Sequence, residues 1–240
     1  MTDLEAIRVR RSRRAYTGPL ETKDVLALQA EIAALALDSG LHITLVEDGA
    51  SLFGGITKSY GMFSGVHSLL ALSCGANNAP AREAAGYYGQ RLVLDATKMG
   101  LGTCWVGGTY DRKKMADLAP AGTEILVVIT LGPVKEKPTF VERTVRVATH
   151  RGGPDIGGLY VADEIPPAWF LDGVRAAALA PSALNKLPTR FAWKNGVATA
   201  FVPEGRALNL VDLGIAKLHF EVAAKGKFDT GNGAVFRRAE

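Results

Sequence analysis

The stretch GYYGQRLVLDATKMGLGTCWVGG, residues 86–108, decides how this chain folds. Upstream of Gly100 its apolar side chains recur every three or four residues, which predicts an amphipathic helix from about Arg82 to Met99 with one face against a core. Gly100 ends that helix, because glycine readily adopts the left-handed conformation of a C-terminal cap. The glycine-rich run at 100–108 then predicts a loop whose backbone can be approached closely.

Apolar periodicity predicts further elements on both sides of this helix. Helices are predicted near 20–38, 111–118, 169–178 and 208–224, and strands near 42–46, 66–73, 124–131, 190–194 and 197–202. Asn195-Gly196 joins the last two strands as a hairpin turn. The segment from Pro133 to Pro167 is polar and rich in Pro and Gly, which predicts a connection between two halves, 1–150 and 160–240. The pattern indicates an α+β fold, a mixed sheet flanked by helices.

A faint internal similarity links the two halves. LVLDATKMG at 92–100 aligns with LHFEVAAKG at 218–226, an offset of 126 residues, the difference between 226 and 100. Many amphipathic helices would match as well by chance, so this alignment alone does not establish a duplication.

Composition indicates a compact globular protein that stays in the cytoplasm. Hydrophobic residues make up 48% and charged residues 22% of the 240 positions. There is no apolar run long enough to cross a bilayer, and the start MTDLEAIRVRRSRRAY is charged where a secretory signal needs its apolar stretch. Cys74 and Cys104 are expected to be reduced there, although a disulfide between them is left open.

The net charge of +4 is concentrated near the N-terminus. Five arginines lie within seven residues: Arg8, Arg10, Arg11, Arg13 and Arg14. Such a cluster attracts phosphate, either of a nucleic acid or of a small cofactor. A nucleic-acid binder would also need interleaved aromatic residues or a recognition helix, and this sequence lacks that pattern. Guanidinium groups of Arg10 and Arg14, with the Ser12 hydroxyl, could surround a phosphate dianion.

Several motifs resemble the nitroreductase superfamily. RRSRRAY at 10–16 resembles its arginine-serine opening, and 86–108 is similar to its central helix and following flavin loop. APSALNKLP at 180–188 resembles the family segment Pro-Ser-Ser-x-Asn-x-Gln-Pro, but here it follows the central helix instead of preceding it. DLGIAKLHFE at 212–221 supplies a second helix of central type. This order resembles the branch named putative nitroreductases, in which one chain is similar to the two-subunit dimer of ordinary members.

The resemblance implies one FMN held between the halves of a single-chain pseudo-dimer, with the second copy truncated. The implied cofactor-binding residues are Arg10, Arg11, Ser12 and Arg14 around the phosphate, Val106, Gly107 and Gly108 in the loop facing flavin N5, Pro181, Ser182, Ala183 and Asn185 in the opposite wall, and the late arginine Arg143. Leu187 stands where the family often has Gln, which leaves one polar contact missing or replaced.

The implied activity is reduction of a small electron-poor acceptor, such as a nitroaromatic or quinone, with NADH or NADPH as electron donor. The flavin carries the redox chemistry, so no catalytic acid or base and no metal is predicted. His219 is expected to be a hydrogen-bonded structural residue. A noncatalytic flavin-binding or flavin-storage protein would share every one of these motifs, and turnover alone separates the two. The pseudo-dimer is expected to be active as a monomer, without nucleic-acid or membrane partners.

Overall fold

The computed structural model describes residues 1–53, 62–75, 78–107, 110–149, 156–203 and 206–239. Residues 1–149 contain α1 (Asp3–Val9), α2 (Thr22–Ser39), β1 (His42–Val46), η1 (Ala50–Leu52), β2 (Ser68–Gly75), α4 (Ala79–Lys98), β3 (Gly102–Val106), α5 (Arg112–Ala116), β4 (Thr123–Gly132) and α6 (Phe140–Thr149). Residues 156–239 contain η2 (Ile156–Leu159), β5 (Tyr160–Ala162), α7 (Ala168–Ala177), η3 (Ala183–Asn185), β6 (Arg190–Lys194), β7 (Val197–Phe201), α8 (Ala207–Ala224), β8 (Gly226–Phe228) and β9 (Ala234–Arg238).

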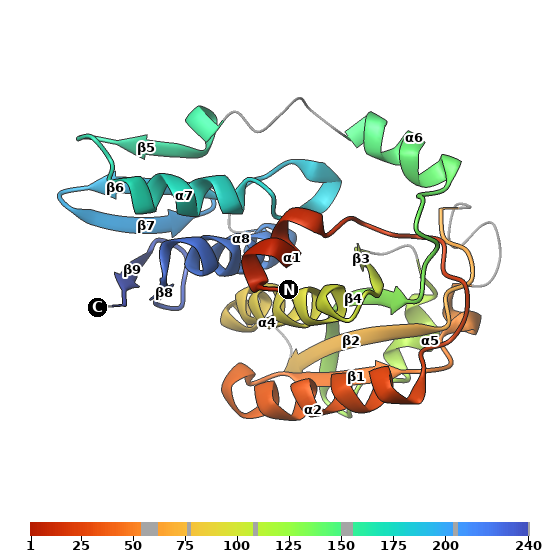
Figure 1. The fold of residues 1–240 in the computed structure, drawn as a ribbon. Helices are drawn as coiled ribbons and strands as arrows, with labels where there is room; N and C mark the ends of the chain where they lie inside the picture. Colours follow the sequence, from red (N-terminus) through yellow and green to blue (C-terminus); the bar gives the residue numbers. More distant parts are fainter. Residues whose placement is uncertain (54–61, 76–77, 108–109, 150–155, 204–205, 240) are drawn as a thin grey trace.

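The strands form two sheets, with the long helices α4 and α8 between them (Figure 1). The first sheet has the order β1-β2-β4-β3 and the second β5-β6-β7-β9-β8. Neighbouring strands are antiparallel in both sheets except for β5 and β6, which are parallel. The expected α+β fold is confirmed, and its mixed character comes from that one parallel pair.

The two sheets repeat one topology. In chain order α2, β1, β2, α4, β3 and β4 are matched by α7, β6, β7, α8, β8 and β9. The sheet order β1-β2-β4-β3 is likewise matched by β6-β7-β9-β8, with the same antiparallel pairings. The second set lacks the connecting helix α5, has shorter last strands and adds β5 at one edge.

A single large core joins the two sheets. One face of the first sheet, including Leu70 and Ile129, packs in this core together with residues of α2 and α4. Phe170 of α7 and Phe220 of α8 belong to the same core, as does Phe191 of the second sheet. The opposite face of the first sheet covers a separate, smaller cluster. Burial of apolar surface on both sides of α4 and α8 therefore holds the two sheets to one another.

The helices α4 and α8 cross at two glycines. A Cβ on Gly86 would collide with the carbonyl oxygen of Val211, and a Cβ on Gly214 would collide with the carbonyl oxygen of Glu83. The contact is reciprocal, because each glycine meets the residue three positions before the other. Equivalent positions of α4 and α8 are therefore 128 residues apart in the sequence, the difference between 214 and 86. The sequence alignment above had set this separation at 126.

Several elements differ from the sequence-based expectation. The helix α6 and the strand β5 form within the stretch expected to be only a connection. Residues 102–106, expected to belong to a loop, pair with β4 as the strand β3. The helix α1 and the strands β8 and β9 were not predicted. Both cysteines are free and buried, which excludes the disulfide that the sequence left open.

Within the described ranges, no helix combines the length and the apolar character needed to cross a membrane.

Candidate functional site

The arginine-rich segment after α1 lies along the strand β3. Ser12 forms a parallel bridge with Thr103, and the backbone N–H of Arg13 donates to the Thr103 carbonyl at 2.8 Å. We call residues 10–14 the N-terminal arm. The arm and the start of β3 are far apart in the sequence, and this pairing places them side by side.

Three predicted residues of the arm converge on the buried thiol of Cys104. Burial raises the pKa of Cys104, while the charges of Arg14 and Arg10 and a hydrogen bond from Ser12 act in the opposite direction. The hydrogen bond requires Ser12 to lie next to the sulfur, and the charges of Arg10 and Arg14 are near enough to act on the same thiol. The structure therefore brings Arg10, Ser12 and Arg14 together at one place beside β3.

Arg10 has two unsatisfied guanidinium donors among the described residues. Within the described part of the chain, its Nε and Nη1 atoms are buried and have no hydrogen-bond partner. Burial lowers the pKa of Arg10 to about 10, and the charges of Arg11 and Arg14 lower it further. Buried donors in proteins are almost always paired. The two free donors of Arg10 are therefore suited to bind an anion.

The other two arginines of the arm are held by the protein itself. Arg11 turns back onto the end of α1, where its Nη1 donates to the carbonyls of Arg8 and Arg10 at 2.7 and 2.8 Å. Arg13 Nε donates to Glu142 at 3.2 Å and its Nη2 donates to the carbonyl of Lys135 at 2.7 Å. The positive charge available to a ligand is thus centred on Arg10 and Arg14.

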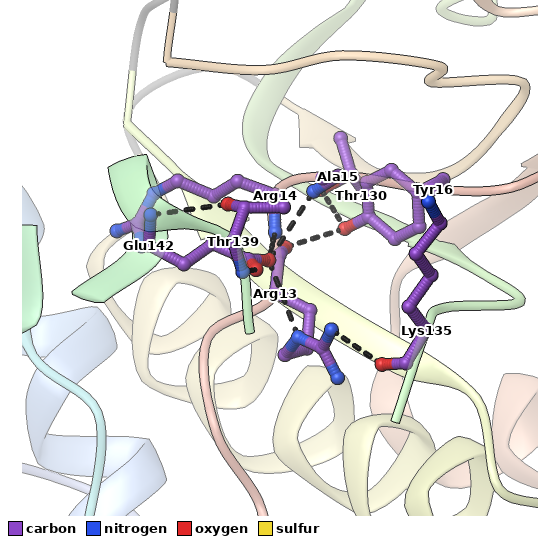
Figure 2. Close-up of polar contacts among 8 residues, drawn as sticks. All are labelled: Arg13, Arg14, Ala15, Tyr16, Thr130, Lys135, Thr139 and Glu142. Atoms are coloured by element: carbon purple, nitrogen blue, oxygen red, sulfur yellow. Dashed lines mark hydrogen bonds and ion pairs between the residues drawn. The ribbon is translucent and has the colours of Figure 1, made fainter. Parts of the chain in front are cut away.

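One carboxylate, that of Glu142, fixes the course of the arm (Figure 2). Its Oε1 accepts the backbone N–H groups of Arg14 at 2.6 Å and Ala15 at 3.3 Å, besides Arg13 Nε. Its Oε2 accepts the N–H of Thr139 at 2.7 Å. Burial acts to raise the pKa of Glu142, but these N–H groups and the charge of Arg13 outweigh it, and the pKa lies below its usual range.

Sequence reasoning missed Glu142, although a signal was present. Thr139 and Glu142 form a capping box at the start of α6, in which the Glu142 N–H also donates to Thr139 Oγ1 at 3.3 Å. A Thr-x-x-Glu pattern marks such a helix start. The predicted residue Arg143 follows Glu142 on α6 and is exposed.

The predicted loop after β3 is described only as far as Gly107. Val106 is buried in the smaller core, whereas Gly107 is exposed and a Cβ there would meet no described atom within 4 Å. Packing within the described protein therefore does not require glycine at 107. Gly108 lies outside the described residues.

The segment with Pro181, Ser182, Ala183 and Asn185 forms a tight bend between α7 and β6. Leu184, Asn185 and Leu187 all have positive φ, at 53°, 53° and 46°. Such a conformation is uncommon for residues other than glycine and persists where the surroundings enforce it. Here Ser182 Oγ accepts the N–H of Leu187 at 2.9 Å, which closes the bend.

Asp212 of α8 lies beneath this bend. It is 6% exposed, and its two carboxylate oxygens accept the backbone N–H of Ala183 at 3.3 and 3.2 Å. Burial raises the pKa of Asp212 to about 7, against the opposing effect of that N–H group. A buried carboxyl with so little compensation is typical of functional sites, and sequence reasoning did not single out Asp212.

Buried groups connect the arm with this bend. The charge of Arg10 acts on the imidazole of His219, and His219 Nδ1 lies 3.1 Å from the carbonyl oxygen of Ala176 in the last turn of α7. The bend begins a few residues after Ala176. The candidate site thus draws on both sheets: an anion-attracting cluster beside β3 and a constrained wall between α7 and β6.

Comparison with known proteins gives one family and several solved structures that are similar to this chain. The profile of the family described as "Putative TM nitroreductase" matches residues 3–224. A solved structure from Thermotoga maritima described as a "putative nitroreductase" superposes with a TM-score of 0.64 at 19% identity, over 98% of this chain and 92% of that one. A nitroreductase family protein from Clostridium difficile 630 has a TM-score of 0.47 at 14% identity, over 69% of this chain and 100% of its own. A search of curated proteins gave no match.

Proposed function

This chain belongs to the Putative TM nitroreductase family, and on that premise we propose that it is an FMN-dependent oxidoreductase that uses NADH or NADPH to reduce small electron-poor acceptors such as nitroaromatics or quinones. Membership makes it a nitroreductase-type oxidoreductase. The cofactor, the donor and the acceptor class are the proposal.

The observation that carries the proposal is that two buried donors of Arg10, Nε and Nη1, have no hydrogen-bond partner among the described residues. These two donors, with Arg14 and Ser12 facing the same place, fit a phosphate dianion such as the terminal group of FMN. The binding of an anion there would satisfy both donors and neutralise the repulsion between Arg10 and Arg14. Glu142 contributes by holding the backbone of Arg14 in place.

The proposed site continues from the phosphate along β3. Val106, Gly107 and Gly108 would border the isoalloxazine ring on one side, and Pro181, Ser182, Ala183 and Asn185 would form the opposite wall. Bound FMN would supply hydride and electron transfer, so the chain itself needs only to bind, orient and shield it. Arg11 and Arg143 would contribute positive potential at the edge of the site.

The two matching topologies support a pseudo-dimer within one chain. We propose that residues 1–150 and 160–240 are the two nitroreductase-like halves and that the reciprocal crossing of Gly86 and Gly214 marks the axis between them. The wall at Pro181–Asn185 then comes from the same chain as the arm, and the protein works as a monomer. Its place is proposed to be the cytoplasm, without nucleic-acid or membrane partners.

Titration of the apoprotein with FMN, followed by flavin fluorescence, tests the site. Arg10→Ala and Arg14→Ala should each weaken binding by about 1.5 to 3 kcal/mol, which is roughly 10- to 150-fold. Arg8→Ala is the matched control, because it removes an exposed arginine on the last turn of α1. Equal FMN affinity in all four proteins would exclude the phosphate assignment.

Anaerobic mixing of the FMN-loaded protein with NADH or NADPH separates enzyme from storage protein. Bleaching of the flavin, followed by reoxidation with a nitroaromatic or quinone, is expected. A bound flavin that neither nicotinamide reduces would favour the storage function instead.

A further inference from the structure

A buried chain of hydrogen bonds crosses the molecule from β3 to α7. Trp105 Nε1 donates to Gln90 Oε1 at 3.0 Å, Gln90 Nε2 lies 2.9 Å from His219 Nε2, and His219 Nδ1 lies 3.1 Å from the Ala176 carbonyl oxygen. Gln90 on α4 and His219 on α8 are both fully buried. The chain thus links four elements, two from each side of the α4–α8 crossing.

Chemistry fixes the direction of every bond in this chain. The indole of Trp105 can only donate, so Gln90 must accept with Oε1 and offer its amide N–H to His219. His219 Nε2 must then be the unprotonated nitrogen, and Nδ1 carries the proton toward Ala176, whose carbonyl can only accept. Both ends independently require the same neutral tautomer of His219.

The two ends of the hydrogen-bond chain, Trp105 and Ala176, lie next to the two walls of the proposed site. Trp105 directly precedes Val106 and Gly107, and its ring packs on α4 so closely that a Cβ on Gly89 would lie 2.7 Å from Cη2. Ala176 lies in the last turn of α7, just before the Pro181–Asn185 wall.

We infer that Gln90 and His219 are positioning residues, which set Val106 and Gly107 at the end of β3 against the wall after α7 and so fix the gap in which the cofactor ring would lie. This inference rests on the proposed function. Neither side chain acts on the substrate; each acts through the backbone that it holds.

The environment of His219 keeps this link in one state. Burial lowers the pKa of His219 to about 3, and the charge of Arg10 contributes to the lowering. A second proton on Nε2 would face the amide donor of Gln90 and break the chain. His219 therefore stays neutral across the physiological range and serves as a fixed connection instead of a proton carrier.

The first test uses the protein without flavin. Hydrogen exchange of the Trp105 indole N–H is measured by NMR, with the resonance assigned by Trp105→Phe and the other two tryptophans as internal references. Gln90→Leu should speed this exchange about tenfold or more, because the indole N–H loses its acceptor. Nitrogen shifts of His219 should show Nδ1 protonated and Nε2 free. A protonated Nε2 of His219, or an unchanged exchange rate in Gln90→Leu, would show that this hydrogen-bond chain does not exist.

The second test uses the FMN-loaded protein. Gln90→Leu and His219→Leu should slow flavin reduction at saturating NADH or NADPH about tenfold or more, because a small displacement of a site wall has a large effect on rate. His219→Gln can still accept from Gln90 and should restore part of the rate. Tyr87→Phe is the control, since it removes another α4–α8 hydrogen bond, to Glu221 at 2.6 Å, outside the chain.

The outcomes are distinct. Rates of Gln90→Leu and His219→Leu that match Tyr87→Phe overturn the positioning role, even if FMN binds. Failure of the unmodified protein to bind FMN overturns the proposed function. The exchange measurement on Trp105 still decides whether the hydrogen-bond chain exists.

Discussion

At the scale of single residues, Glu142 shows how one carboxylate can organise two backbones. It caps α6 through Thr139 and at the same time holds the arm through Arg14 and Ala15. Because the arm carries the proposed phosphate ligands, the stability of α6 and the geometry of the site depend on the same atoms.

Glu142→Gln should therefore lower both stability and FMN affinity. The amide can accept with only one oxygen, so at least one charge-assisted bond is lost, at a cost of about 1.5 to 3 kcal/mol. Thermal melting of the apoprotein and FMN titration measure the two effects, with the exposed Glu136→Gln as control. Loss of stability without loss of affinity would show that Arg14 does not depend on this anchor.

Asp212 gives a prediction with a definite pH dependence. Its pKa is about 7 in the folded protein and near 3.8 when exposed, so between these values the folded state keeps a proton that the unfolded state releases. The unfolding free energy consequently falls as pH rises through this window, and the penalty is complete above about pH 7. Asp212→Asn should raise the melting temperature at pH 8 and change it far less at pH 4.

The exposed Asp163→Asn serves as the control for this comparison. An equal effect of Asp212→Asn at the two pH values would mean that the carboxyl is not held protonated by its surroundings.

At the scale of elements, segments with a clear apolar period or turn signal were predictable, including the short helix α5, and segments without one were not. The helices α2, α4, α7 and α8, the strands β1, β2 and β4 and the β6–β7 hairpin follow from apolar spacing and turn residues, with ends shifted by a few positions. The strand β8 has only 3 residues, and in the 5-residue β9 three apolar residues are followed by two arginines, so neither shows an apolar alternation. In α1 only Ala6 and Ile7 are buried, so its apolar period is never completed.

Two misses came from composition. Pro and Gly in the flanking sequence indicated a connection where α6 forms, although the Thr-x-x-Glu capping box could be recognised in the sequence. Glycines at 100–108 suggested a loop, but a Cβ on Gly102 would collide with Val134 and Arg13, so this glycine serves packing inside a strand. In the site, the proposal for Arg10, Ser12 and Arg14 could be made from the sequence because their pattern is local, and their role stays a prediction. Glu142, Gln90 and Asp212 were not, because their roles depend on partners distant in sequence.

The helix crossing gives a prediction at this scale. Gly86→Ala and Gly214→Ala should each destabilise the protein by about 1 to 3 kcal/mol, because the new methyl group meets a rigid backbone carbonyl. The loss should appear despite the better helix propensity of alanine, about 1 kcal/mol. Denaturant unfolding measures it, and Gly18→Ala, where a Cβ meets nothing within 4 Å, is the control. Unchanged stability would mean that the helices can move apart freely.

At the scale of the whole molecule, the matching topologies predict a complete site in one chain. Sedimentation of the FMN-loaded protein should show a monomer with one flavin per chain. Mixing Arg10→Ala chains with Asn185→Ala chains should restore no binding, because both residues belong to the same site. Recovery of FMN binding in the mixture would place the site between two chains and refute the pseudo-dimer.

The crossing of α4 and α8 also bears on how this protein can change over generations. In a dimer of identical subunits every substitution is expressed twice, once on each side of the axis. In this chain the register of 128 residues pairs Gln90 with Leu218 and His219 with Arg91. Each position mutates alone, so one side of the axis can acquire a buried polar link while the other keeps an apolar or charged residue. This chain can therefore evolve different residues at the two matching positions. A homodimer with the same fold cannot, because both of its subunits carry the same sequence.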